Sequence, residues 1–514
     1  MSSTACRWER FVLAKKPAGF LIVWVLFPSV VFLFYFLPLT VFVSLLLQAW
    51  ETRSGVEGRN LTASNAWLVI ASLCFYAWGE ARLLWVLILS GSLSFFGGKA
   101  VGNRSGRRRT AALYGFVGGE IMLLIFFKYG GLIEGIFTRI GLALGDHAGP
   151  ESGWKGIALP LGISFFTFHG ISYVVDIYKG RIAPVRRPVD FACYFSMFPQ
   201  LVAGPIVRYS EVAVFFQYRV VTTEDVYWGL RRFVAGLGKK VLIANQVSVL
   251  ADASFALPLA DCTAATAWLG TLAYALQIYF DFSGYSDMAI GMGRLFGFRF
   301  PENFDQPYLA TTVREFWRRW HMTLSRFFRD YLYIPLGGSR TGSVRTYVNL
   351  VVVFALCGLW HGASWNFLSW GLFYGVFLAV EHAVAPNVTR RPGWLQLIGH
   401  IYTLAVVLFA WVLFRCETWE QSLATWHAML DLGHLSRIGA IPWNALSPDV
   451  SIAFFAGVMM CTPIFNLART VSMRTPLGRL FVPWLAAVGP LAVLGLCMLC
   501  IGAGSHNPFI YYRF

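Results

Sequence analysis

Charged residues are scarce in this chain. Asp, Glu, Lys and Arg together make up 13% of the 514 residues, and the mean hydropathy is +0.58, whereas soluble domains carry roughly 25% charged residues. Hydrophobic residues reach 57% and aromatic residues 17%. This composition excludes a string of ordinary soluble domains and predicts an all-α protein that crosses a membrane many times.

Acidic residues are the scarcer of the two signs, so the formal net charge is +16. The Lys and Arg residues cluster in short loops between apolar runs, as the positive-inside rule describes. We therefore expect the basic residues to face membrane lipid, and we expect no nucleic-acid partner.

The sequence shows no metal-binding pattern of histidines, and its CxxC does not favour a redox function. None of the nine histidines stands in an HxxxH or HExxH pattern, so we expect no metal site. Cys497 and Cys500 form a CxxC inside an apolar run, where buried thiols are favoured over a redox pair. No internal repeat is visible, which counts against inverted-repeat transporter folds.

Apolar runs long enough for membrane helices recur along the whole chain. We predict about ten to twelve transmembrane helices in one membrane-embedded domain, residues 26–514, after a basic N-terminal extension, residues 1–25. The basic start predicts a cytoplasmic N-terminus, and the alternation of loops predicts a C-terminus on the opposite side. Residues 191–207 are apolar but broken by Pro199, Gly204 and Pro205, which favours a re-entrant segment of a funnel wall.

The most informative stretch is residues 303–338, NFDQPYLATTVREFWRRWHMTLSRFFRDYLYIPLGG. A single helix from Val313 to Tyr331 places aromatic and aliphatic side chains on one face and arginines on the other, which suits a helix along the membrane interface. His321 lies within this predicted helix. His361 follows in an apolar segment, near the hinge between two predicted crossings, where an ionisable group indicates function.

Two buried imidazoles suit proton abstraction from a hydroxyl that attacks a thioester, because imidazole titrates near neutral pH. We expect one histidine to act as general base while the other holds or polarises the acyl carbonyl. The alternative for either His321 or His361 is a hydrogen-bonded core residue.

Basic side chains beside His321 can pair with the phosphates of a cytoplasmic cofactor such as coenzyme A. Lipid headgroup contact is the alternative for each of them. The predicted cofactor site consists of Asn303, Arg314, Trp317, Arg318, Arg319 and Arg326.

Other polar residues within apolar runs favour structural roles. Asp281 and Asp287 need charged partners, and the arginines that follow them are the expected ones. For His169, we expect packing rather than catalysis.

Several segments together resemble a known family. FWRRWHMTLSRFFRDYLYIPLGGSR is followed by GLWHGASWNFLSWG, and FPQLVAGPIVRYSE and the terminal NPFIYYRF support the likeness. These segments resemble the membrane-bound O-acyltransferase (MBOAT) family, and within it the bacterial branch that contains the membrane subunit of alginate O-acetylation. The likeness runs from about Leu26 to Phe514.

The resemblance implies a ring of tilted helices around a funnel, with His361 as the catalytic base and His321 as its companion on the cytoplasmic side. It implies acetyl-CoA as the donor, a location in the bacterial inner membrane and a C-terminus in the periplasm. The implied acceptor is a periplasmic SGNH-type protein that acetylates an exopolysaccharide, alginate first. Tyr374 stands where many relatives have another histidine, so no role is assigned to it.

Alternatives remain open at this point. Within the family, cellulose, peptidoglycan and teichoic-acid modification are rivals of alginate. From other classes, the same buried His and Asp residues suit a transporter or proton relay, and the chain suits a non-catalytic scaffold of a polymer-export complex.

Overall fold

The computed structural model describes residues 27–53, 61–143, 158–340, 342–384, 393–431 and 441–504. These residues are mostly helical and include no strand, which confirms the predicted all-α class. The predicted extension 1–25 and both chain ends lie outside the described residues.

Eight stretches within the described ranges are long and apolar enough to cross a membrane, which confirms a polytopic membrane protein. The sequence predicts about ten to twelve transmembrane helices, which is more than the eight candidates in the described residues. The eight are Phe32–Arg53, Thr62–Gly102, Gly106–Thr138, Thr223–Phe255, Ser343–His361, Trp365–Val384, Gly393–Arg415 and Pro476–Gly502.

Two long helical regions depart from a simple membrane span. Thr62–Gly102 contains two helices, α3 (Thr62–Glu80) and α4 (Leu84–Gly102), of 19 residues each. The longest helix, α13 (Ala264–Leu295), has 32 residues and is buried along most of its length. It is not among the eight spans, and it forms the centre against which other helices pack.

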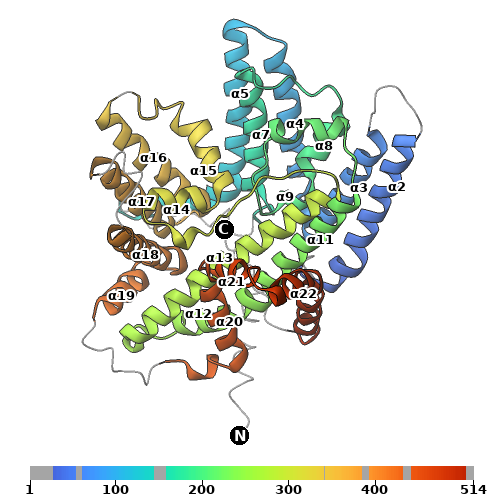
Figure 1. The fold of residues 1–514 in the computed structure, drawn as a ribbon. Coiled ribbons are helices and arrows are strands. Elements are labelled where there is room, and N and C mark those ends of the chain that lie inside the picture. The colour runs from blue at the N-terminus through green and yellow to red at the C-terminus, as the bar shows by residue number, and fades with distance from the viewer. Residues whose placement is uncertain are drawn as a thin grey trace.

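α13 runs through the middle of the view, with the other helices around it (Figure 1). α4, α5 and α7 pack together at the top of the view, α16, α17 and α18 lie on the left, and α11 and α12 pack along α13. The remaining bounds are α2 Leu37–Arg53, α5 Gly106–Leu124, α6 Gly130–Ala143, α7 Ile163–Tyr178, α8 Pro188–Ser196, α9 Phe198–Leu201, α10 Tyr209–Gln217, α11 Thr223–Gly238, α12 Asn245–Phe255, α14 Val313–Arg319, α15 Met322–Phe328, α16 Ser343–His361, α17 Trp365–Val384, α18 Gly393–Arg415, α19 Trp419–Leu430, α20 Pro448–Met460, α21 Ile464–Ser472 and α22 Pro476–Gly502.

The prediction of one helix from Val313 to Tyr331 is wrong. The chain forms α14 and α15, separated by Trp320 and His321, and His321 has a left-handed φ of 42°. The break is stable because a neighbouring segment satisfies its backbone groups: the Asp305 amide donates to the Arg319 carbonyl (2.9 Å), and the Met322 amide donates to the Asn303 carbonyl (2.9 Å). The predicted apolar face is nevertheless buried on both helices.

The interruption predicted in residues 191–207 is present. α8 and α9 are short, and the irregular residues 202–207 after them are buried. The buried Ile206 amide donates to Thr323 Oγ1 (2.9 Å), so this irregular backbone is satisfied inside the protein. A re-entrant path through the membrane stays a prediction.

Asp281 and Asp287 pair with basic residues that precede them in the chain, whereas the prediction named the arginines that follow. Lys240 Nζ lies 2.7 Å from Asp281 Oδ1, and Arg232 and Lys239 each contact Asp287 at 2.7 Å. These basic residues lie on α11 and the π-helical turn Lys239–Ala244, which pack on α13. The predicted partners were wrong because proximity in sequence does not determine which basic residues the packing of helices brings next to the two carboxylates.

Glycine allows α16 and α17 to approach closely before their hinge. A Cβ added to Gly358 would lie 2.1 Å from the Phe367 carbonyl oxygen, and one added to Gly371 would lie 2.2 Å from the Phe354 carbonyl oxygen. Small residues at such crossings are typical of membrane helix pairs. The predicted hinge near His361 is confirmed, because α16 ends at this residue.

Candidate active site

His321 is fully buried at the break between α14 and α15. Its Nδ1 lies 3.1 Å from Asn303 Oδ1, and its ring packs edge-on against Phe282 with centroids 4.6 Å apart. Its Nε2 is buried and has no hydrogen-bond partner among the described residues. The imidazole is therefore held at one nitrogen and available at the other.

The surroundings of Asn303 assign the tautomer of His321. Asn303 Oδ1 also accepts the Thr323 amide (3.3 Å) and the Thr323 hydroxyl (2.8 Å), while Nδ2 donates to Ser286 Oγ (3.1 Å). Because Oδ1 is the acceptor, Nδ1 of His321 must carry the proton. The neutral ring then presents a lone pair at Nε2, so this histidine can accept a proton. The expected polarisation of a carbonyl would require its protonated form.

His361 is the last residue of α16 and is 4% exposed. Its ring lies among aromatic side chains, with centroids 4.7 Å from Trp360, 5.0 Å from Trp370 and 5.1 Å from Phe414. The following Gly362 has an extended backbone that ends the helix. This aromatic enclosure excludes water from the imidazole.

Trp360 brings the two histidines together. Its ring centroid lies 6.2 Å from that of His321 and 4.7 Å from that of His361. Phe168 of α7 stacks on the same indole at 5.3 Å, and Phe165 contacts it edge-on at 5.7 Å. The residues that sequence reasoning selected as a catalytic pair thus both lie next to the same indole ring.

A cavity of about 750 Å³ lies between α14, α15, α16 and the end of α17. Its lining includes both basic and apolar side chains. Its lining includes four predicted cofactor residues, Arg314, Trp317, Arg318 and Arg326, together with Met322, Phe354, Cys357 and His382. Neither catalytic candidate lines it. Met322 adjoins His321 in the chain, however, and Cys357 lies one helical turn before His361, so two lining residues are neighbours of the pair in sequence.

The other two predicted cofactor residues lie elsewhere. Asn303 is 1% exposed and does not line the cavity, because its side chain is committed to His321 and its neighbours. Arg319 also lies outside the lining, where it pairs with Glu315 (3.0 Å) and Asp305 (3.5 Å). Arg318 is exposed at the cavity.

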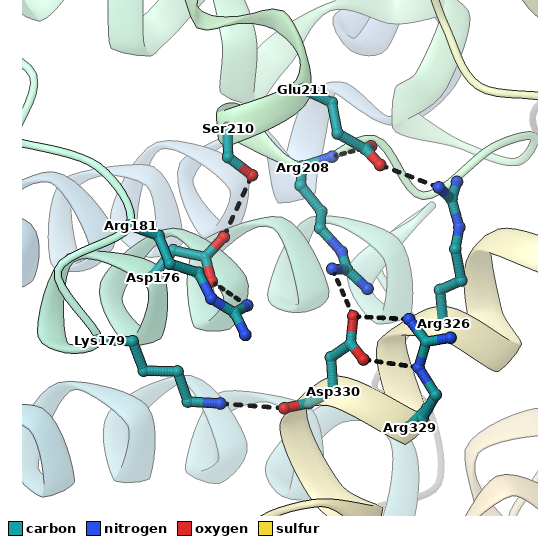
Figure 2. Close-up of polar contacts among 9 residues, drawn as sticks. All are labelled: Asp176, Lys179, Arg181, Arg208, Ser210, Glu211, Arg326, Arg329 and Asp330. Carbon is teal, nitrogen blue, oxygen red and sulfur yellow. Dashed lines mark hydrogen bonds and ion pairs between the residues drawn. The ribbon is translucent and has the colours of Figure 1, made fainter.

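A charged network holds the basic side of the cavity (Figure 2). Asp330 contacts Arg208 (2.8 Å) and Arg329 (2.7 Å), and Glu211 of α10 contacts Arg326 (3.2 Å). Burial favours the neutral acid at Asp330, but the hydrogen bonds from the two arginines prevail and hold the pKa of this carboxyl below its ordinary value. The network fixes the π-helical turn Arg329–Tyr333 against the segment before α10.

Glu315 and Glu381 fix α14 beside the cavity. Burial acts to raise the pKa of Glu315, but hydrogen bonds from Thr311 and Arg319 lower it overall. Glu381 of α17 accepts the first helical amides of α14, from Val313 (2.6 Å) and Arg314 (3.0 Å). A carboxylate at a helix N-terminus is favoured by the helix dipole.

Sequence reasoning missed several residues of this region. His382 lines the cavity, with Nδ1 3.5 Å from Arg314 Nη2. Lys128 and Tyr129 reach the backbone just before His361 from a helix more than 200 residues earlier in the chain. A lysine inside an apolar run was a visible signal for this contact, because such residues are rare in membrane helices.

His169 is fully buried, and its ring lies 5.6 Å from that of Tyr194. Both ring nitrogens lack a hydrogen-bond partner among the described residues. It packs within the wall formed by α7 and α8, as expected.

A family model matches residues 186–419 of this chain, and its description is membrane-bound O-acyltransferase family. The matched segment contains both histidines and all six predicted cofactor residues.

Similar proteins cover nearly the whole chain. A protein of Pseudomonas putida named "Probable alginate O-acetylase AlgI" is 36% identical over 95% of this chain and 100% of its own length. Its namesake in Azotobacter vinelandii is 39% identical with the same coverage. A "Peptidoglycan O-acetyltransferase" of Helicobacter pylori is 32% identical over 95% of this chain and 97% of its own.

Proposed function

The chain belongs to the membrane-bound O-acyltransferase family, and from this premise we propose that it moves an acetyl group across a membrane for O-acetylation of a secreted polysaccharide. The observation that carries the proposal is the pair of buried imidazoles that both lie next to Trp360, together with a nearby cavity whose lining includes arginines.

Acetyl-CoA is the proposed donor. Arg314, Arg318 and Arg326 line one part of the cavity, where guanidinium groups can pair with the phosphates of coenzyme A. Trp317, Phe354 and Cys357 line the apolar part, which suits the uncharged arm that carries the thioester.

The chemistry is a transfer between a thioester and a hydroxyl. His361, the base implied by the family resemblance, takes the proton of the acceptor hydroxyl as its oxygen attacks the acyl carbon. The carbon–sulfur bond breaks, and the leaving thiolate recovers the proton from the imidazolium. His321 presents Nε2 as a second proton acceptor and can orient the hydroxyl. Exclusion of water by the aromatic enclosure protects the acyl group from hydrolysis.

The proposed acceptor is a periplasmic protein of the SGNH type, which passes the acetyl group to the polymer. We place the enzyme in the bacterial inner membrane, with the N-terminus in the cytoplasm and the C-terminus in the periplasm. Alginate is the proposed polymer because relatives similar along nearly the whole chain carry that name. The peptidoglycan-modifying relative makes peptidoglycan the next candidate.

The test measures thiol release from acetyl-CoA by purified protein in lipid nanodiscs, with a purified periplasmic SGNH-type protein added as the acceptor. We expect His361→Ala and His321→Asn to lower turnover by about 10²-fold or more, the contribution of a general base. Asparagine is chosen at His321 because it tolerates the left-handed backbone there. His427→Ala, at an exposed histidine on α19, is the matched control and should retain wild-type turnover.

Polymer acetylation in cells separates the alternatives. An acyltransferase predicts that both active-site variants still export polymer, but without acetyl groups. Strongly reduced export, with normal acetylation of the polymer that still leaves the cell, would support a transporter. Wild-type acetylation by both variants would support a scaffold and would refute the proposal.

A further inference from the structure

The end of α16 is held from outside by two consecutive residues. The last carbonyls of an α-helix have no partner within the helix. The Tyr129 hydroxyl donates to the Leu359 carbonyl (2.7 Å), and the Lys128 ammonium donates to the Trp360 carbonyl. His361 follows immediately, so both contacts fix the backbone from which its imidazole projects.

Lys128 makes further contacts at the same place. Its Nζ donates to Ser164 Oγ of α7 (3.1 Å) and lies 5.7 Å from the centroid of the Trp360 indole. A cation at a helix C-terminus is favoured by the helix dipole, and a cation over an indole gains a cation–π contact. This one ammonium therefore joins α7, Trp360 and the end of α16.

The local backbone supports a specialised role. Lys128 and Tyr129 belong to a π-helical turn, Ile125–Tyr129, that interrupts the apolar stretch Gly106–Thr138. Such turns cost hydrogen-bond geometry and are frequently found at functional sites. A lysine in an apolar membrane helix is costly unless it is used.

We propose that Lys128, assisted by Tyr129, is a positioning residue that holds His361 and Trp360 in place for acyl transfer. This inference rests on the proposed acetyltransferase function. It requires no contact between Lys128 and substrate, because the ammonium acts on the backbone carbonyl one residue before the base. Removing it should mainly lower the rate of the chemical step, since Lys128 is not among the residues that line the cavity that would bind acetyl-CoA.

The experiment compares kcat and KM for acetyl-CoA in nanodiscs. Lys128→Met keeps the apolar stem and loses the ammonium; we expect kcat to fall by about 10²-fold, as misplacement of a reacting group by about 1 Å can cause, with KM within about threefold of wild type. Lys128→Arg keeps the charge and donors and should retain at least about a tenth of wild-type kcat. Tyr129→Phe should lower kcat by a smaller factor.

Lys99→Met is the matched control. Lys99 also lies in an apolar helix and over an aromatic ring, 4.3 Å from the centroid of Phe95, but its helix, α4, packs mainly against α5 and α7. Wild-type kcat in Lys128→Met, or an equal loss in Lys128→Arg and Lys128→Met, would overturn the proposal. If Lys128→Met does not purify as a folded protein, the kcat of Tyr129→Phe decides.

The design separates this inference from the proposed function. Inactive wild-type protein would reject the acetyltransferase assignment and the role of Lys128 with it. Active wild type, inactive His361→Ala and fully active Lys128→Met would reject only the positioning role.

Discussion

Replacing Asn303 with leucine removes the acceptor that fixes the tautomer of His321. The substitution leaves two buried donors of fixed direction, the Nδ1–H of His321 and the Thr323 amide, without their partner. Each orphaned buried donor costs about 1–3 kcal/mol, so we expect a loss of about 2–6 kcal/mol in the free energy of unfolding. The Thr323 hydroxyl can rotate and adds less.

The same substitution should affect catalysis more than substrate binding. Without the Oδ1 acceptor the imidazole can turn and the proton can move to Nε2, so we expect kcat for thiol release from acetyl-CoA to fall by about 10²-fold. Asn303→Asp keeps an acceptor at this place and should lose less activity than Asn303→Leu. The KM for acetyl-CoA should change little in either variant, because Asn303 does not line the cavity.

The control is Asn349→Leu. Asn349 is 5% exposed and donates to two backbone carbonyls, those of Leu336 (3.3 Å) and Gly338 (3.1 Å). Its replacement should lower the melting temperature while the surviving folded protein keeps wild-type kcat. A folded Asn303→Leu protein with wild-type kcat would refute the role of Asn303 in fixing the tautomer of His321. A rise in the KM for acetyl-CoA alone would instead support the sequence-based prediction that Asn303 binds the cofactor.

Two further predictions concern the frame of the site. Asp330→Asn should lower the free energy of unfolding at pH 7 by about 2 kcal/mol, because charged hydrogen bonds to two arginines are lost. The pKa of Asp330 is depressed in the folded protein. The difference in melting temperature between wild type and variant should therefore be complete well above pH 4 and shrink as the pH falls below about 4, the ordinary pKa of the carboxyl. A difference that widens below this pH would contradict the ion-pair explanation. Gly358→Ala should separate α16 from α17 and lower both the melting temperature and kcat. The control is Gly115→Ala, whose added Cβ has nothing within 4 Å, so it should leave both quantities unchanged or slightly raise stability. Equal effects of the two substitutions would exclude the close helix crossing as the cause.

The sequence was sufficient for the helical membrane class and for the hinge at His361, because composition and apolar length act locally. It was insufficient for the break at His321. The amphipathic pattern continues across Trp320 and His321, so periodicity predicted one helix. What breaks it is a tertiary contact: residues 303–305 supply hydrogen bonds to both sides of the interruption. Patterns within a segment do not report bonds that another segment offers.

The prediction of partners for the buried charges failed for a related reason. Lys240 and Asp281 are 41 positions apart, and only the packing of α13 on the turn Lys239–Ala244 joins them. Lys128 was overlooked because its partner carbonyl is 232 residues away. The cofactor prediction, which relied on local clustering of arginines around His321, placed four of its six residues at the cavity.

The two histidines are therefore positioned by different kinds of contact. His321 is held by Asn303, 18 residues before it, whereas the backbone before His361 is held by the turn Ile125–Tyr129. Trp360 joins the two arrangements because it contacts both rings and also receives the contacts of Lys128 and α7. A shift of the turn Ile125–Tyr129 would consequently move the backbone before His361 without breaking the bond between His321 and Asn303. The distance between the imidazoles thus depends on how the N-terminal helices pack, although neither histidine belongs to them.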